Sequence, residues 1–200
     1  MRRSVYTICA AVGAALVMNM TACGSGAGNT STEQTGETTS GAETTEAETA
    51  AETEQVDLNE VLEAVKDAYG SDYLPDTAID ETTLAQTFGI DSGLYEEFVG
   101  EMPAISTHVD TFLAVRAADG QGETVEELLN AYRNSQIESA VQYPMNMPKL
   151  KASKVVRYGD DVYFVMLGAY DDSTEDEDQL VAVYESRTQI GLDMIDSFYE

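Results

Sequence analysis

The composition of residues 24–55 limits which part of this chain can form a folded domain. Residues 24–55 contain no aromatic, branched aliphatic or basic residue, and consist mainly of Gly, Thr, Ala and Glu. Such a composition cannot bury enough apolar surface to offset the entropy lost when a chain becomes ordered. We therefore expect a disordered acidic spacer that spans roughly 30 Å as a flexible coil, and one globular domain over residues 56–200.

The residues before the spacer have the pattern of a secretory signal peptide. Arg2 and Arg3 give a positively charged start, and residues 8–18 form an apolar run. A membrane-spanning helix needs about 20 apolar residues. The shorter run therefore predicts a signal peptide over residues 1–22.

The sequence MTAC, which ends at Cys23, resembles a bacterial lipobox in which Met20 replaces the usual leucine. The resemblance implies that Cys23 receives a diacylglycerol and becomes the first mature residue. Two acyl chains anchor a protein stably to a membrane, so we expect it on the outer face of the cytoplasmic membrane in a Gram-positive-type envelope. An ordinary secreted protein cut near Ala22 is the alternative.

Processing limits the chemistry that remains. Cys9 leaves with the signal and Cys23 is blocked by lipid, so no cysteine is left for a disulfide or a zinc site. The mature chain carries 37 acidic and eight basic residues, a net charge of −29. This charge repels nucleic acid and anionic lipid, so the lipid on Cys23 is the only membrane contact expected.

Apolar periodicity and turn residues predict the elements of the domain. Helices are expected over 58–69 and 81–88, ended by Gly70 and Gly89, and after the capping pairs Thr124/Glu127 and Thr174/Glu177. Strands are expected over 95–102, 109–117, 153–158 and 162–168, with Gly159-Asp160 as a hairpin turn. This order predicts an α+β fold, helix–hairpin–helix–hairpin–helix, with a mostly antiparallel sheet and helices packed on one face.

Several of these segments together resemble a known family. They are Asp110 followed by FLAV, the helix ending in YRNSQIES, the QYPMN block and the hairpin KVVRYGDDVYFVMLG. The chain is similar here to an uncharacterised bacterial lipoprotein family, domain of unknown function 4358, over roughly residues 60–198. The resemblance supports the envelope location and the fold, and it implies no activity, cofactor or site residue.

The residues offer little for catalysis or metal binding. His108 would share a strand face with Ser106 and Asp110, but no nucleophile motif accompanies it. The acidic run DDSTEDED, residues 171–178, fails the calcium-loop pattern in both registers and suits a helix start instead. No catalytic residue, metal or cofactor is predicted.

The stretch QYPMNMPKL, residues 142–150, is most simply a connector, because Pro144 and Pro148 stop a helix and delay a strand. Half of the mature basic residues follow within a short distance, which favours a second interpretation as a docking surface for an anionic envelope protein or wall polymer. Its members would be Tyr143, Met145, Asn146, Met147, Lys149, Lys151, Lys154 and Arg157. Lysines that protect a strand edge are the alternative.

These observations favour a non-catalytic, lipid-anchored binding or accessory protein of the cell envelope. The alternative is an envelope hydrolase with a carboxylate-based site that acts on wall glycan or peptide. Acidic residues are so frequent that a carboxylate pair is a nonspecific signal, and the chain has no tryptophan to line a sugar cleft.

Overall fold

The computed structural model describes residues 55–105, 107–139 and 142–200. The predicted signal peptide, the predicted lipidation site Cys23 and nearly all of the predicted spacer lie outside these residues. The described chain belongs to one unit, residues 50–200. Its elements in order are α1 (Leu58–Tyr69), η1 (Gly70–Asp72), β1 (Thr77–Ala78), α2 (Glu81–Phe88), β2 (Tyr95–Met102), β3 (Thr111–Ala117), α3 (Gly122–Glu138), η2 (Pro144–Asn146), α4 (Met147–Ala152), β4 (Lys154–Tyr158), β5 (Asp161–Met166) and α5 (Glu177–Asp196).

The first two helices have the boundaries that the sequence predicts. Asp57 caps α1 by accepting a hydrogen bond from the backbone N–H of Asn59, at 2.8 Å. Asp80 caps α2 in the same way. Gly89 ends α2 with φ of 74°, in the left-handed region that only glycine adopts freely.

The five strands of the described chain form one antiparallel sheet in the order β1-β2-β3-β5-β4. The predicted α+β class and antiparallel sheet are therefore confirmed. β3 lies at the centre, and every one of its residues is buried. β1 has only two residues, too few to produce a recognisable pattern in the sequence.

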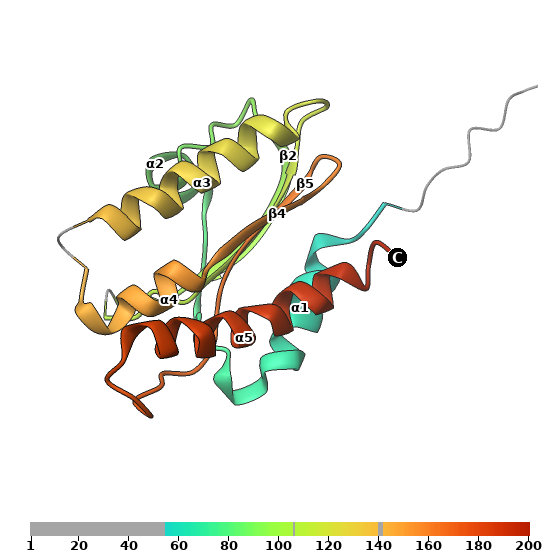
Figure 1. Ribbon diagram of the computed structural model, residues 1–200. Helices are drawn as coiled ribbons and strands as arrows, with labels where there is room; N and C mark the ends of the chain where they lie inside the picture. Colours follow the sequence, from blue (N-terminus) through green and yellow to red (C-terminus); the bar gives the residue numbers. More distant parts are fainter. Residues whose placement is uncertain (1–54, 106, 140–141) are drawn as a thin grey trace, which may run out of the picture. The chain divides into compact units, whose positions relative to one another are not determined.

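The prediction that the helices pack on one face of the sheet is wrong. Leu113 and Val115 of β3 belong to an apolar core with residues of α2 and α3. Phe112 and Ala114, which alternate with them, belong to a second core with α1 and α5. β3 and β5 are apolar on both sides, so both sides must be covered (Figure 1).

The predicted order of helices and hairpins is also too simple, because α4 lies where a connector was expected. Pro144 and Pro148 do not prevent helix there, because they occupy the first turns of η2 and α4. In a first turn the backbone N–H needs no helical partner.

Two predicted helix starts differ from the observed ones. α5 begins at Glu177 with Asp176 as its cap, not Thr174. α3 begins at Gly122, before Thr124, because a distant residue completes its first turn. Asp160, in the turn between β4 and β5, accepts a hydrogen bond from the Gly122 N–H at 3.1 Å.

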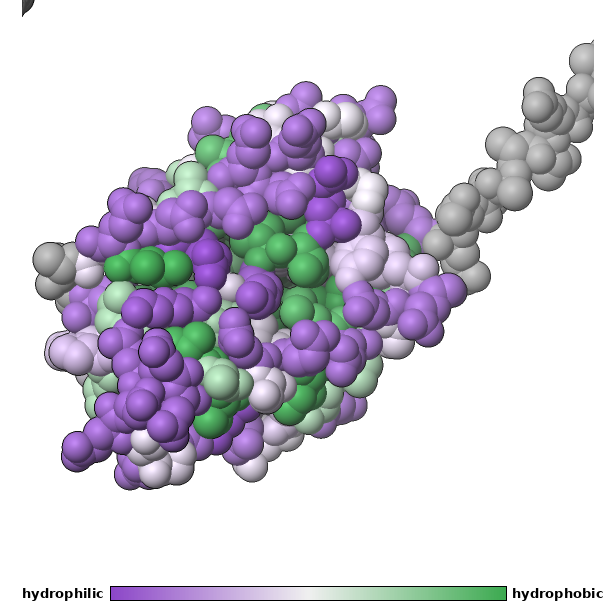
Figure 2. All heavy atoms as spheres, viewed as in Figure 1, coloured by the Kyte–Doolittle hydropathy of each residue, from purple (hydrophilic) through white to green (hydrophobic). Residues whose placement is uncertain are grey.

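One face of the described chain carries α3, β4 and α5. Hydrophilic side chains cover most of this face, and apolar side chains appear between the two helices, in the region of the edge strand β4 (Figure 2). No described helix is both long and apolar enough to span a membrane.

Candidate functional site

The proposed docking surface at η2 and α4 contains a residue that is not on the surface at all. Lys149 is only 5% exposed, and its Nζ lies 2.8 Å from both carboxylate oxygens of Asp110 and 2.6 Å from the carbonyl oxygen of Gly168. All three ammonium protons are therefore used within the fold. The amine also lies over the ring of Tyr184, 5.3 Å from its centroid.

Burial shifts both members of this ion pair. It raises the pKa of the Asp110 carboxyl and lowers the pKa of the Lys149 amine, because removal from water disfavours each charged form. The attraction between the two groups opposes both shifts. The pair joins α4 to the residue before β3, Lys149 also joins α4 to the chain after β5, and no free amine is left for nucleophilic chemistry.

The other three basic residues of the proposed surface are each paired with a carboxylate. Their ion pairs are Lys151–Glu177 at 2.5 Å, Lys154–Glu185 at 3.7 Å and Arg157–Glu126 at 2.7 Å. These exposed pairs contribute little to stability. They do neutralise the positive cluster, so the surface does not present the free cations that an anionic partner would need.

The remaining members divide between surface and interior. Tyr143 and Met145 are about half exposed, at 51% and 52%. Asn146 is buried and its side-chain amide donates to the carbonyl oxygen of Thr107, and Met147 packs partly buried against the core. The structure therefore brings only part of the predicted set to the surface.

His108 is exposed, and among the residues that the structure describes it has no hydrogen-bonded partner of the kind a catalytic triad requires. The Asp110 carboxylate is held by Lys149, so it does not orient the imidazole. Ser106 lies outside the described residues.

The acidic run 171–178 forms the approach to α5. Asp176 caps the helix by accepting from the Gln179 N–H, and Asp171 pairs with Arg187 at 2.6 Å. Within residues 55–105, 107–139 and 142–200, no group of three or more His, Cys, Asp or Glu side chains is arranged to hold a metal.

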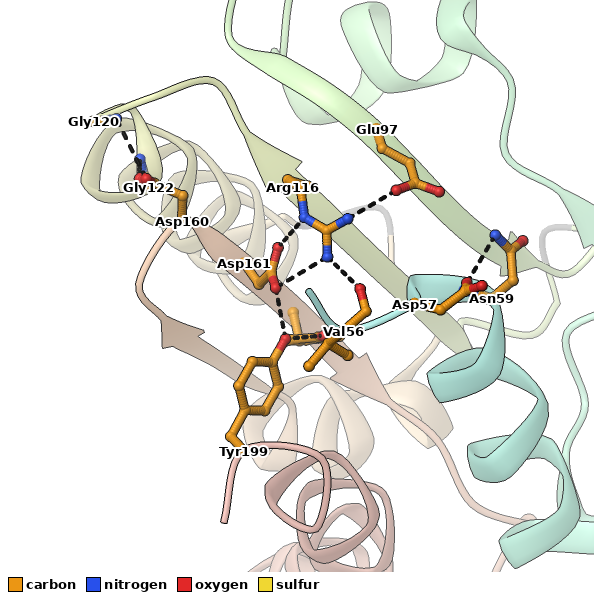
Figure 3. A network of polar contacts seen from close by, with 11 residues as sticks. Val56, Asp57, Asn59, Glu97, Arg116, Gly120, Gly122, Asp160, Asp161 and Tyr199 are labelled. Carbon is orange, nitrogen blue, oxygen red and sulfur yellow. Dashed lines mark hydrogen bonds and ion pairs between the residues drawn. The ribbon is translucent and has the colours of Figure 1, made fainter. Parts of the chain in front are cut away.

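A second polar network lies at the other end of β3, around Arg116 (Figure 3). Arg116 Nε donates to Asp161 Oδ1 at 2.8 Å, and Nη2 donates to Asp161 Oδ2 at 3.2 Å. Nη1 donates to Glu97 at 3.0 Å, and Nη2 also donates to the carbonyl oxygen of Val56. A guanidinium held in this way is rigid and has little capacity left for a ligand.

Two tyrosines extend this network. Tyr199 donates its hydroxyl proton to Asp161 Oδ2 at 2.8 Å, and the hydroxyl of Tyr163 lies 2.5 Å from that of Tyr199. The ring of Tyr199 stacks on Tyr158 at 4.2 Å between centroids. Burial raises the pKa of the Tyr163 phenol to about 12 and raises the pKa of Tyr199 as well, so both stay protonated at neutral pH.

A cavity of about 680 Å³ opens beside this network. That volume lies within the range of small-molecule sites in proteins, roughly 300–1,000 Å³. Its wall combines apolar surface from Val56, Ala117 and Phe198 with an excess of acidic side chains. The acidic residues are Glu96, Asp119, Asp160, Asp161 and Glu200.

Neither the Arg116 cavity nor the partner of Lys149 was among the features predicted from the sequence. The sequence does contain a signal of buried charge, because Asp110 lies directly before a mostly apolar strand and Arg116 lies within it. A charged residue that must be buried needs a partner, but the partners are 39 and 45 residues further along the chain. No local pattern identifies them.

The fold and its two internal ion networks define an α+β domain with an antiparallel sheet covered by helices on both faces. The family described as Domain of unknown function (DUF4358) matches residues 68–167, from the end of α1 to just beyond β5. This is half of the chain, and the chain belongs to that family. It matches no curated protein and no solved structure.

Proposed function

We propose that this chain is a non-catalytic, lipid-anchored binding or accessory protein on the outer face of the cytoplasmic membrane. Support for the location is the sequence pattern alone, the apolar run 8–18 followed by Cys23. Support for binding comes from the cavity beside Arg116.

The composition of the cavity wall carries the proposal. Among the described residues that line the cavity, none is Ser, Thr, Cys, His or Lys, so carboxylates and Tyr199 are the groups there that could act as a nucleophile or base. Arg116 and Asp161 are engaged with each other, and Asp160 is engaged with α3. The wall therefore offers shape, aromatic surface and negative charge, which suit binding better than bond cleavage.

The charge of the wall selects among envelope partners. An anionic polymer or protein would meet Glu96, Asp119 and Glu200, and the guanidinium that could balance them is already paired. We therefore favour a neutral or cationic envelope ligand, such as a wall peptide with a free amine, over the anionic partner expected from the sequence.

The carboxylate-based envelope hydrolase is the second candidate, and the same acidic wall is the observation that favours it. Glycan hydrolysis needs two carboxylates on opposite sides of a bound sugar. Glu96 and Asp119 both line the cavity and are the residues on which such a reaction would depend.

One experiment separates the two functions. The full chain is mixed with a disaccharide-peptide from cell wall that carries a free amine, and with the same molecule after acetylation of that amine. Binding is measured by calorimetry and by the rise in melting temperature that any ligand of the folded state causes. Turnover is followed by mass spectrometry of the probe.

Binding of the amine probe without turnover, weakened by acetylation and by Glu96→Gln, is the expected result. Glu60→Gln, an exposed acid of α1 outside the cavity, serves as the matched control. Cleavage of the probe would establish the hydrolase instead. The absence of both binding and turnover would overturn the role proposed for the cavity.

A further inference from the structure

Four of the most exposed large hydrophobic side chains come from three segments at one end of the sheet. Ile105 follows β2, Tyr143 and Met145 flank the start of η2, and Tyr170 follows β5, with exposures of 60%, 51%, 52% and 54%. We call these four residues the loop-end surface. Scattered apolar residues on a surface need no explanation, but a group of them indicates a contact site.

Internal hydrogen bonds hold the three segments in place. The Asn146 side chain donates to Thr107 O at 3.3 Å, which fixes η2 against the segment after Ile105. Lys149 bonds to Gly168 O and to Asp110, which fixes the segment before Tyr170 against α4 and the start of β3. The three segments lie together at the end of the sheet away from the β4–β5 turn (Figure 1). These bonds tie the segments on which the loop-end surface lies to one another at residues close to its members.

The rim of this surface is acidic. Asp172, Glu175 and Asp178 follow Tyr170 closely, and no described basic group forms an ion pair with them. Two of the basic side chains nearby are already paired with carboxylates, Arg187 with Asp171 and Lys151 with Glu177. The apolar group is thus bordered by uncompensated negative charge.

We propose that the loop-end surface docks a second protein, one that presents an apolar centre bordered by lysine or arginine. Tyrosine and methionine are enriched in the cores of protein interfaces, and the acidic rim requires a basic complement. A second copy of this chain would oppose acid to acid, and an anionic membrane surface would be repelled. This site is separate from the Arg116 cavity. Its partner would be basic, whereas the basic cluster in the sequence favoured an anionic partner.

The test uses the full chain in native envelopes. A photo-crosslinking phenylalanine analogue replaces Tyr143 or Tyr170, and in a control chain it replaces Ile190, a hydrophobic residue of α5 that is 43% exposed and outside the surface. The protein captured from the first two positions is identified and purified, and its affinity for the full chain is then measured.

We expect capture from Tyr143 and Tyr170 but not from Ile190. The double variant Tyr143→Ala/Tyr170→Ala should weaken binding by about tenfold or more, as is usual for interface anchors. The triple variant Asp172→Asn/Glu175→Gln/Asp178→Asn and added salt should weaken it too, while Ile190→Ala should not.

All the substituted side chains are exposed, so melting temperatures should stay unchanged and a loss of binding is not a loss of folding. Capture of only a second copy of this chain, of only lipid, or of nothing would overturn the proposal. An affinity that none of the loop-end variants changes would overturn it as well.

Discussion

The ammonium group of Lys149 lies 2.8 Å from each carboxylate oxygen of Asp110, although the two residues are 39 positions apart in the sequence. Both side chains are buried, so each group is the other's main source of charge compensation. A pair of this kind costs desolvation energy, and its loss on one side only leaves a buried charge alone.

Lys149→Met should therefore lower the free energy of unfolding by about 3–5 kcal/mol, measured by urea denaturation of the full chain. The double variant Asp110→Leu/Lys149→Met should recover much of the loss, because no unpaired charge remains. Lys154→Met, which breaks an exposed pair with Glu185, is the matched control. A Lys149→Met effect no larger than that of the control would contradict the importance of the buried pair.

Arg116→Lys should cost about 2 kcal/mol of stability, because a lysine cannot make the two parallel bonds to Asp161 together with the bond to Glu97. The same change at Arg157, whose ion pair with Glu126 is on the surface, should leave the denaturation midpoint unchanged. Equal midpoints for the two variants would show that the Arg116 network does not stabilise the fold.

Gly122→Ala should destabilise the chain by about 1–3 kcal/mol, although alanine is normally the better helix former. A Cβ at residue 122 would lie 2.6 Å from the backbone oxygen of Gly159 and 2.9 Å from Asp160 Oδ1. Gly93→Ala, where a Cβ meets nothing within 4 Å, is the control for the general effect of the substitution. Melting temperatures measure both changes, and a more stable Gly122→Ala chain would disprove the close approach.

Stability should fall as the pH rises above about 10. The folded state holds the pKa of Tyr163 at about 12, against the ordinary 10.0, and it also raises the pKa of Tyr199. Between those values the unfolded chain loses the phenolic proton and the folded chain keeps it, so unfolding is favoured as pH rises. The stabilisation is complete below pH 10.

Urea denaturation at a series of alkaline pH values measures this slope. Tyr163→Phe, which removes one of the titrating groups, should make the slope shallower. A stability that stays constant from neutral pH to beyond pH 11, where the unfolded phenols are ionised, would contradict the protonated state of these tyrosines.

The parts of the fold that local chemistry decides could be predicted from the sequence. Asp57 and Asp80 cap their helices through bonds to neighbouring N–H groups, and Gly70 and Gly89 end the same helices, so these signals lie within a few residues of the structure they produce. The start of α3 could not be predicted in this way. Its first turn is completed by Asp160, which belongs to a turn 38 residues later.

The candidate sites depend almost entirely on distant pairs. Lys149 looked like a surface cation in the sequence because its neighbours are basic, and only the contact with Asp110 places it inside. Tyr143 and Met145 were members of the docking surface predicted from the sequence, and both are about half exposed, whereas Asn146 of the same predicted surface is buried. The Arg116 cavity combines residues from both ends of the described chain, which no short motif can indicate.

The hydrogen bond from Arg116 to the carbonyl oxygen of Val56 fixes the place where the N-terminal segment of the described chain meets the domain. It places the entry of the chain from the N-terminal side at the end of β3 that carries Arg116, whereas Lys149 and the loop-end surface lie at the opposite end of that strand, about 20 Å away along its length. An anchor on the N-terminal side of the chain would therefore attach to the domain at the end of β3 that carries Arg116. The opposite end of the domain carries the exposed apolar side chains of the loop-end surface.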